Sequence, residues 1–401
     1  MINAAIIGTG GISPAHIEGY LKFPQRCKIV ALVDIYPEKA ETKKKNFNLD
    51  AEIFDSHQAL LAHACAVKED IHLVSICTPP FTHAEIAIDC LKAHKNVILE
   101  KPMAASLEEC DAILKAAEMA ARERAGAGKL SVIAQNRFRT PIMNLKKTLD
   151  SGLIGRVLHA QVDSFWWRGH CYYDLWWRGS WEKEGGGCTL NHAVHHIDML
   201  CWMMGLPAEI TAVLSNAAHD NAEVEDISVA VLKYPNGSLA QLTSSTIHHG
   251  EEQKLIFQGE KAKISAPWDV VASLSKGNGF PERNVALEKE IQDFYEALPN
   301  VECETHAGQI DNVLTAIENN TEPLIKGTDG RNTIELITAI YKAGSTERNV
   351  KLPITHADEF YTVAGIRKNA KHFYEKSAQA AELTDEAITV GSNYDAPVRK
   401  K

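Results

Sequence analysis

The chain has 401 residues, enough for two domains with separate cores, and 45% hydrophobic and 23% charged residues are typical of a globular protein. Its 52 acidic and 42 basic side chains give a formal net charge of −10, which disfavours a nucleic-acid partner, because nucleic-acid-binding proteins carry a basic surface. No apolar run approaches the roughly 20 residues that cross a bilayer. Nine scattered cysteines without a C-x-x-C pair predict neither a disulfide framework nor a zinc site, and so a reduced, cytoplasmic protein.

The first 136 residues alternate between predicted strands and helices. Apolar runs predict strands at Ala4–Ile7, Lys28–Val33, Leu73–Cys77, Asn96–Leu99 and Leu130–Ala134. Helices are predicted over residues 16–21, 84–93 and 106–121. The spacing of Ser106 and Glu109 is that of a capping box at the start of the last helix. This alternation predicts a doubly wound parallel sheet for residues 1–136.

The pattern changes after residue 136. Strands are expected at 157–165, 209–215, 227–234, 239–247, 254–258 and 261–265. Pro235-Asn236-Gly237 predicts a hairpin turn, and two helices are expected at 310–319 and 333–345. Residues 137–353 are therefore expected to form an α+β domain with a large, open, mostly antiparallel sheet. Residues 354–401 are interpreted as a polar helical extension.

The turn after the first strand resembles the dinucleotide fingerprint G-x-G-x-x-G/A. Gly8, Gly10 and Ser13 occupy its small-residue positions, with Gly11 and Ile12 between them. Such a turn lets the backbone approach a pyrophosphate at a helix N-terminus. Asp34 ends the second strand, where a carboxylate can bind the ribose hydroxyls and repel a 2′-phosphate, so NAD is favoured over NADP.

Later strands also end in residues that suit a ligand site. Lys101 follows the run Val97–Leu99 within Glu100-Lys101-Pro102, and partial desolvation at a strand end can lower a lysine pKa enough for proton transfer. Thr78, Pro79 and His83 are candidates for the nicotinamide side, although His83 could equally cap the helix beside it. Cofactor contacts are thus expected from Gly8, Gly10, Gly11, Ile12, Asp34, Thr78, Pro79, His83, Glu100, Lys101 and Asn136.

A dense aromatic block follows residue 164 and holds five of the seven tryptophans. Aromatic faces stack on the C–H faces of sugar rings, and arginine and tyrosine tips bind hydroxyls or carboxylates. Substrate contacts are therefore expected from Arg168, Tyr172, Tyr173, Trp177 and Arg178. The alternative is an aromatic core beneath a long loop, which suits two or three of the rings.

Four ordered motifs resemble the glucose-fructose oxidoreductase / inositol dehydrogenase / rhizopine catabolism (Gfo/Idh/MocA) family. They are Gly-Thr-Gly-Gly-Ile-Ser, Thr-Pro-Pro-Phe-Thr-His, Glu-Lys-Pro and Gly-Gly-Gly…Asn-x-x-x-His-x-x-Asp, and the resemblance spans residues 1 to about 353. It implies an N-terminal Rossmann domain and a C-terminal α/β domain whose open sheet often mediates oligomerisation. We therefore expect a homo-oligomer, a dimer or a tetramer.

The resemblance also implies residue roles. Lys101 matches the catalytic lysine of the family, and His195 matches its general acid/base. Asn191 stands where many members have aspartate, so it is expected to bind the substrate, as is His192. The Tyr-Tyr…Trp-Arg-Gly block is similar to members that oxidise C3 of glycosides or nucleotide sugars.

A metal is not expected, although His192, His195, His196 and Asp198 cluster in the sequence. Their spacing is not H-E-x-x-H, and the resemblance gives His195 a redox role.

Three functions remain open from the sequence. The first is an NAD-dependent dehydrogenase that oxidises a secondary hydroxyl of a sugar or glycoside. The second is a redox-neutral enzyme that holds NAD tightly and re-reduces its own intermediate, for glycoside cleavage or exchange. The third is a regulator that binds NAD without catalysis, which retention of Lys101 and His195 argues against.

Overall fold

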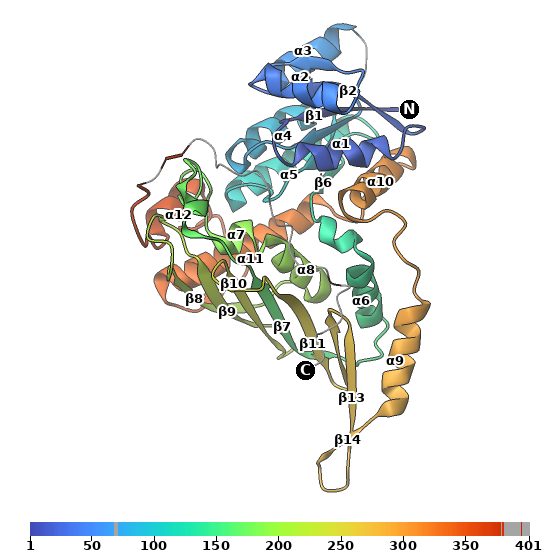
Figure 1. The fold of residues 1–401 in the computed structure, drawn as a ribbon, viewed down its shortest axis with the longest axis vertical. Helices are drawn as coiled ribbons and strands as arrows, with labels where there is room; N and C mark the ends of the chain where they lie inside the picture. Colours follow the sequence, from blue (N-terminus) through green and yellow to red (C-terminus); the bar gives the residue numbers. More distant parts are fainter. Residues whose placement is uncertain (68–70, 378, 381–393, 395–401) are drawn as a thin grey trace. The chain divides into compact units, whose positions relative to one another are not determined.

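The computed structural model describes residues 1–67, 71–377, 379–380 and 394 (Figure 1). The chain forms two compact units, Met1–Phe138 with Glu302–Ile334, and Arg139–Val301 with Glu335–Lys401. The first unit therefore differs from the expected range 1–136, because residues 302–334 return to it. In the described residues, every helix is too short or too polar to cross a lipid bilayer.

A six-stranded, fully parallel sheet forms the centre of the first unit, in the order β3-β2-β1-β4-β5-β6. Its strands are β1 (Ile2–Ile7), β2 (Cys27–Val33), β3 (Glu52–Phe54), β4 (Leu73–Ile76), β5 (Asn96–Leu99) and β6 (Leu130–Val132). Every residue of β4, β5 and β6 is buried, as expected for parallel strands covered on both faces. The predicted doubly wound sheet is confirmed; of its strands, the sequence analysis missed the short β3, and it also missed two helices of this unit, at 37–46 and 57–67.

The helices of this unit are α1 (Ser13–Leu21), α2 (Pro37–Asn46), α3 (His57–Val67), α4 (His83–Lys92), α5 (Leu107–Glu123) and α10 (Thr305–Glu318), with short 3₁₀ turns η1 (Pro80–Thr82) and η2 (Gln135–Phe138). The capping box is present at α5, where the Glu109 amide donates to Ser106 Oγ at 3.2 Å. Gln309 explains why the late helix α10 belongs here. Its buried amide group binds Ser131, Val132 and Ala134 around β6.

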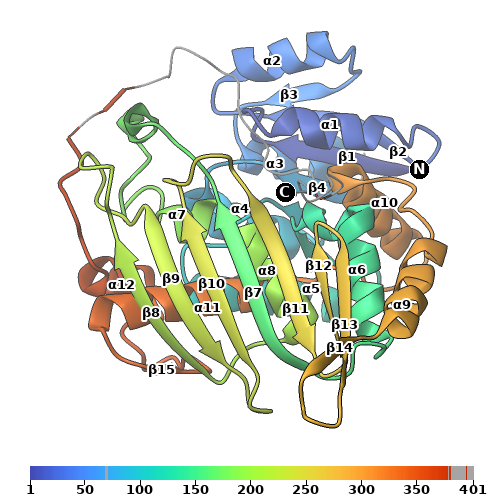
Figure 2. The same cartoon turned by 60° about the horizontal axis from the view of Figure 1, so that its bottom comes forward.

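The second unit is built on a nine-stranded sheet in the order β14-β13-β12-β11-β7-β10-β9-β8-β15, seen as a broad layer in Figure 2. Only β7 and β10 pair in parallel, so the expected mostly antiparallel sheet is confirmed. The strands are β7 (Val157–Phe165), β8 (Glu209–Ser215), β9 (Ile227–Lys233), β10 (Leu239–Ser245), β11 (Gln253–Gly259), β12 (Ala262–Ala266), β13 (Asp269–Ser275), β14 (Pro281–Arg283) and β15 (Val350–Lys351). The predicted hairpin turn joins β9 to β10, with Gly237 at a φ of +86°.

The helices of the second unit are α6 (Thr140–Asp150), η3 (His170–Asp174), α7 (Cys188–Asn191), α8 (Val194–Met204), α9 (Val285–Ala297) and α12 (Val363–Asn369). The long α11 (Gly327–Thr346) begins in the first unit and ends in the second. α7 packs on β9 and β10, and α8 packs on β7. The sheet thus supports the segment from Cys188 to Met204, which carries Asn191, His192 and His195.

The expected helical extension over residues 354–401 is described in part: α12 is a helix within it, while residues 378, 381–393 and 395–401 lie outside the described residues. Described residues after α12 contain no further helix, and Ala380 forms an isolated β-bridge with Leu175. The Ala380 amide and carbonyl group are both paired with residues 174–176, which gives that residue extended rather than helical hydrogen bonds.

Candidate functional site

The turn after β1 requires glycine at its first position. Gly8 has a φ of +91°, and a Cβ atom there would lie 2.8 Å from the carbonyl carbon of Cys77. Gly10 and Gly11 are exposed, and a Cβ on either would meet no described atom within 4 Å. Ile12 is the N-cap of α1, and no side chain in the described chain caps that end. The Ser13 and Ala15 amides donate to the Gly10 and Ile12 carbonyl oxygens at 3.3 and 3.1 Å, and Pro14 has no N–H, so a phosphate anion would be received by the glycine turn that precedes α1.

Asp34 lies directly beside this glycine turn. Its Oδ2 accepts hydrogen bonds from the Thr9 amide at 2.8 Å and the Thr9 hydroxyl at 2.7 Å. Its Oδ1 accepts one from the Tyr36 amide at 3.0 Å. The carboxylate is thus where the spacing predicted, at the end of β2, and it also holds the turn in shape.

Glu100 is the centre of a buried polar cluster at the end of β5. Nε2 of His16 lies 3.0 Å from its Oε1, and Nε2 of His306 lies 3.5 Å from the same oxygen. The Lys101 amide donates to its other oxygen at 3.1 Å. These contacts hold the backbone of Lys101, whose side chain is half-buried. Sequence analysis missed His16 and His306, because neither has a motif that links it to Glu100.

The protonation of this cluster follows from its contacts. Burial opposes a charge on Glu100, but the hydrogen bond from His16 and the nearby ring of His306 outweigh it and hold the pKa of Glu100 well below its usual range. Burial lowers the pKa of His16, whose Nδ1 lies 3.2 Å from Ser75 Oγ. A neutral His16 that accepts from Ser75 and donates to Glu100 satisfies both contacts. Lys101 therefore lies next in the chain to a carboxyl group that is buried and ionised near neutral pH.

The other strand ends hold the remaining cofactor candidates. Thr78 is half-buried and Pro79 is exposed after β4, while Asn136 is half-buried after β6. His83 is fully buried, with Nδ1 2.9 Å from the Pro102 carbonyl oxygen and Nε2 2.9 Å from that of Thr78. It links the turns after β4 and β5, and burial lowers its pKa. The expected cofactor contact of His83 is replaced by this structural role, because its ring is covered by the protein.

In the second unit, residues 165–181 form what we call the aromatic loop, and Arg178 lies at its centre. The guanidinium carbon of Arg178 lies 4.2 Å from the ring centre of Tyr172 and 4.1 Å from that of Trp177. Its Nη1 donates to Glu184 at 3.0 Å. The guanidinium carbon of Arg168 lies 5.6 Å from the same Tyr172 ring. Burial raises the pKa of Tyr172 to about 12, so it remains a neutral hydroxyl donor. Four expected substrate residues thus form one cluster.

Tyr173, the fifth, belongs to the core beneath the loop. It is 1% exposed, its ring packs edge-on against His219 at 4.9 Å, and a Cβ at Gly179 would lie 2.9 Å from it. Burial raises its pKa well above the usual range. The expected substrate contact of Tyr173 is therefore replaced by packing, as the aromatic-core alternative predicted for some rings.

The glycine run before α7 packs against a buried carboxylate. A Cβ at Gly187 would lie 2.0 Å from the carbonyl oxygen of Glu225. The Glu225 carboxyl accepts hydrogen bonds from the amides of Gly187 at 3.2 Å and Thr189 at 2.9 Å, and from the Tyr341 hydroxyl at 3.1 Å. Burial raises the pKa of Glu225 to about 7, although these donors favour the charged form. Asn191 donates to the Gly187 carbonyl at 3.3 Å, so its amide also holds this turn.

The two expected histidines follow this turn. Nε2 of His192 lies 3.4 Å from the Tyr172 hydroxyl, and its ring lies 5.6 Å from the Trp166 ring. His195 is half-buried in the first turn of α8, whose start is the N-cap Ala193. The structure thus joins His192, at the end of α7, directly to the aromatic loop and places His195 on the next helix, α8.

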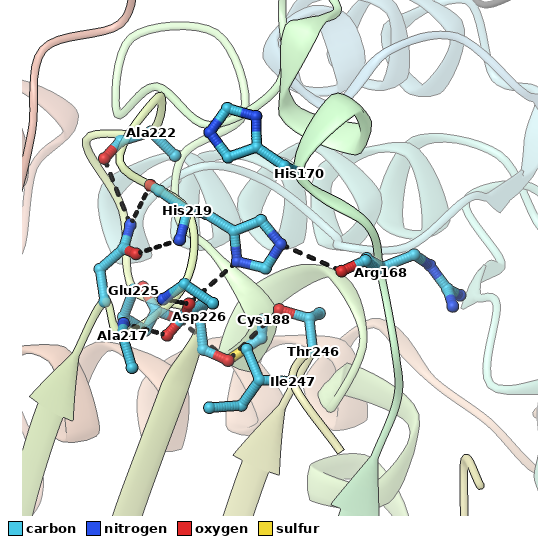
Figure 3. Close-up of polar contacts among 12 residues, drawn as sticks. Arg168, His170, Cys188, Ala217, His219, Ala222, Glu225, Asp226, Thr246 and Ile247 are labelled. Atoms are coloured by element: carbon cyan, nitrogen blue, oxygen red, sulfur yellow. Dashed lines mark hydrogen bonds and ion pairs between the residues drawn. The ribbon is translucent and has the colours of Figure 1, made fainter. Parts of the chain in front are cut away.

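Figure 3 shows a buried histidine–carboxylate pair, His219 and Asp226, that the sequence analysis did not identify. Nδ1 of His219 lies 2.9 Å from Asp226, and its Nε2 lies 3.1 Å from the carbonyl oxygen of Arg168. Asp226 also accepts from the amides of Ala217 at 2.9 Å and Ala218 at 2.8 Å. The pair holds the backbone at Arg168. The signal available in the sequence was Glu225-Asp226 at the start of a strand, where two adjacent acidic residues are unusual.

Two groups of possible metal ligands converge among the described residues. They are His16 with Glu100 and His306, and His57 with Glu85 and Asp89. Neither group includes a histidine from the segment 192–196.

Two family models match this chain. One, described as an oxidoreductase family with an NAD-binding Rossmann fold, matches residues 2–123, and the other, the GFO/IDH/MocA C-terminal domain, matches residues 142–265. The chain belongs to the Gfo/Idh/MocA family of oxidoreductases. Its first unit is the NAD-binding Rossmann fold of that family, which agrees with the glycine turn and Asp34.

Relatives are similar over much of their length. A 2,7-anhydro-N-acetylneuraminate hydratase of Mediterraneibacter gnavus is 26% identical over 73% of this chain and 74% of its own. A levoglucosan dehydrogenase of Pseudarthrobacter phenanthrenivorans is 26% identical over 64% of this chain and 70% of its own. The WlbA dehydrogenase of Bordetella pertussis, solved with NADH and UDP-GlcNAcA, has a TM-score of 0.73 at 25% identity and covers 88% of this chain and 98% of its own.

Replacing Asp34 by asparagine is expected to weaken NAD binding roughly 10-fold and to reduce discrimination against NADP, because a charge-assisted acceptor for the ribose is lost. Titration of NAD and NADP against the purified variant, followed by fluorescence, measures both dissociation constants. Thr9→Val is the matched control: it removes one hydrogen bond to Asp34 but keeps the carboxylate, so the preference for NAD should persist. Unchanged NAD affinity and continued exclusion of NADP in Asp34→Asn would show that Asp34 acts only on the turn.

Proposed function

We propose that this protein is an NAD-dependent oxidoreductase that oxidises a secondary hydroxyl, at C3, of a sugar or glycoside. The proposal rests chiefly on one combination of features in a chain of this family. Lys101 follows β5, and His195 lies in the first turn of α8. Arginine side chains stack on aromatic rings in the aromatic loop, which contacts His192. Aromatic and guanidinium surfaces of this kind suit a sugar ring with its hydroxyls or carboxylate.

NAD bound to the first unit would supply the acceptor for the hydride that leaves the carbinol carbon. His195 takes the hydroxyl proton as general base. The Lys101 ammonium group stabilises the developing alkoxide or relays the proton. The substrate is held by Arg168, Tyr172, Trp177, Arg178, Asn191 and His192. No step of this proposal needs a metal.

The test is oxidation of defined sugars by the purified protein with NAD. The panel contains free hexoses, alkyl and aryl glycosides, myo-inositol, levoglucosan and UDP-sugars, with NADH followed by absorbance and products by mass spectrometry. A substrate deuterated at C3 should transfer deuterium to the reduced cofactor, and its 3-deoxy analogue should be inert. Deuterium transfer from another labelled carbon would overturn C3, and inert behaviour of every class would overturn sugar oxidation.

A redox-neutral enzyme is the second candidate, favoured by the similarity to a named hydratase. Such an enzyme would oxidise and then re-reduce its substrate with the same NAD molecule. It would copurify with NAD, convert a glycoside without net NADH, and carry deuterium from C3 back into product. A non-catalytic regulator is disfavoured, because the family is one of oxidoreductases and both Lys101 and His195 are present.

We also propose a homo-oligomer that forms through the outer face of the nine-stranded sheet. Val213, Val229 and Val231 are 68%, 44% and 49% exposed there, on the paired strands β8 and β9. Valines this exposed on a sheet favour contact with a second copy of the chain. Light scattering should give the mass of a dimer or tetramer, and Val229→Lys should lower it; a monomeric wild-type protein would contradict the proposal.

We also propose a cytoplasmic location. The cysteines whose state the structure describes are all free thiols, which is compatible with a reducing compartment.

A further inference from the structure

The C-terminal segment lies along the aromatic loop. By this segment we mean residues 371–377, 379–380 and 394. Ala380 pairs with Leu175: the Trp176 amide donates to the Ala380 carbonyl at 2.9 Å, and the Ala380 amide donates to Asp174 at 2.8 Å. Lys376 donates to the Tyr173 carbonyl oxygen. These contacts hold the backbone at residues 173–176, which lie between Tyr172 and Arg178 in the aromatic loop.

The start of the segment holds the end of the loop. The Trp181 indole N–H donates to the Lys371 carbonyl at 3.2 Å. The Phe373 amide donates to the Glu223 carbonyl at 2.9 Å, and the Glu223 carboxylate accepts from the Trp181 amide at 3.1 Å. The segment therefore contacts the loop at several points rather than crossing it once. The family models end at residue 265, so they do not describe these contacts.

Tyr394 reaches the helix that carries His195. Its side chain is 3% exposed, and its hydroxyl lies 2.8 Å from Nε2 of His196. Nδ1 of His196 lies 2.9 Å from Ser164 Oγ, which also accepts from the Trp166 indole at 3.1 Å. A continuous hydrogen-bonded chain thus runs from the aromatic loop through His196 to Tyr394.

The position of His196 bears directly on His195. Consecutive residues on a helix point about 100° apart, so a buried His196 sets the direction in which its neighbour projects. With a partner on each ring nitrogen, His196 is restricted to one ring orientation. Loss of the Tyr394 hydroxyl would leave one ring nitrogen buried without that partner, which favours a different rotamer.

We propose that the contacts of Lys371, Phe373, Lys376 and Ala380 support the aromatic loop as a wall of the substrate site in the second unit. We also propose that Tyr394 is a positioning residue that acts through His196 on His195. This inference rests on the proposed function for the role of His195. The contacts that carry it lie within the second unit.

Tyr394→Phe tests the inference, because it removes the hydroxyl and keeps the ring. Tyr374→Phe is the matched control: Tyr374 lies in the same segment but is exposed. Histidine-labelled protein, with His195 and His196 assigned by single substitutions, is followed by NMR against pH. The expected result is a changed His196 ring signal and a shifted His195 titration in Tyr394→Phe only, with both variants folded.

Turnover gives the second measurement once a substrate is found. Tyr394→Phe should lower kcat roughly 10-fold and leave the KM for NAD unchanged, because small misplacement of a catalytic group costs rate rather than cofactor affinity. The NMR result does not depend on turnover, so failure to find a sugar substrate counts against the proposed function alone. The positioning role is overturned if His195 titrates identically in Tyr394→Phe and Tyr374→Phe. It is equally overturned if kcat is unchanged, or if Tm and every kinetic constant fall together.

Discussion

Lys101→Met is expected to lower kcat by roughly 10²–10⁴-fold, the usual contribution of a positioned proton-transfer group. Methionine keeps the length of the side chain and removes its charge. Since the backbone at Lys101 is held by Glu100, which is itself held by His16, the fold around β5 should survive. Single-turnover NADH formation measures the loss, and a separate NAD titration should give a nearly unchanged dissociation constant.

The control for Lys101 is Lys92→Met, at the exposed last position of α4. It removes one positive charge from the same unit at a site outside the proposed machinery. We expect wild-type turnover from this variant. If Lys101→Met also retained wild-type turnover, the lysine would have no part in proton transfer and the regulator hypothesis would gain support.

His195→Asn is the second large effect, with an expected loss of kcat of roughly 10²–10⁴-fold. Asparagine retains a polar side chain at the start of α8 but cannot act as a general base near neutral pH. The variant should also lose the acidic limb of the pH–rate profile, which reports protonation of the general base. A purely structural defect would lower the rate but leave that limb in place. Rate measurements across the pH range check both expectations.

His159→Asn is the control for His195, because His159 lies on β7 of the same unit and outside the proposed site. It should keep both the rate and the profile of the wild-type enzyme. A His195→Asn variant with an unchanged pH profile would assign the base to another group. Lys101 would then be the first alternative to examine.

Local sequence patterns were sufficient to predict most of the strands of the first unit. Short apolar runs identified β1, β2, β4, β5 and β6, because a strand buried on both faces must be continuously apolar. The turn at Gly8 and the position of Asp34 followed from spacing within one strand–turn–helix unit. The three-residue β3 was missed, since a strand this short carries too few residues to give a pattern.

The candidate site was only partly predictable. The sequence placed Tyr172, Trp177 and Arg178 in one aromatic block, but it did not distinguish them from the buried Tyr173. Which ring of an aromatic block is covered depends on what packs beneath it, here His219. The same limit applies to the segment after residue 353, whose polar composition suggested a helix although Ala380 pairs with the aromatic loop.

The sequence by itself determined the class of fold, the family, the cofactor and the chain positions of Lys101 and His195, because each depends on neighbouring residues or on ordered motifs. Only the tertiary structure decided what holds those residues. Glu100 binds His16, Gly187 binds Glu225 and His196 binds Tyr394, across separations of 84, 38 and 198 residues. Periodicity and spacing report contacts within one or two elements of the chain. Contacts over these separations exist only once two distant segments are packed together.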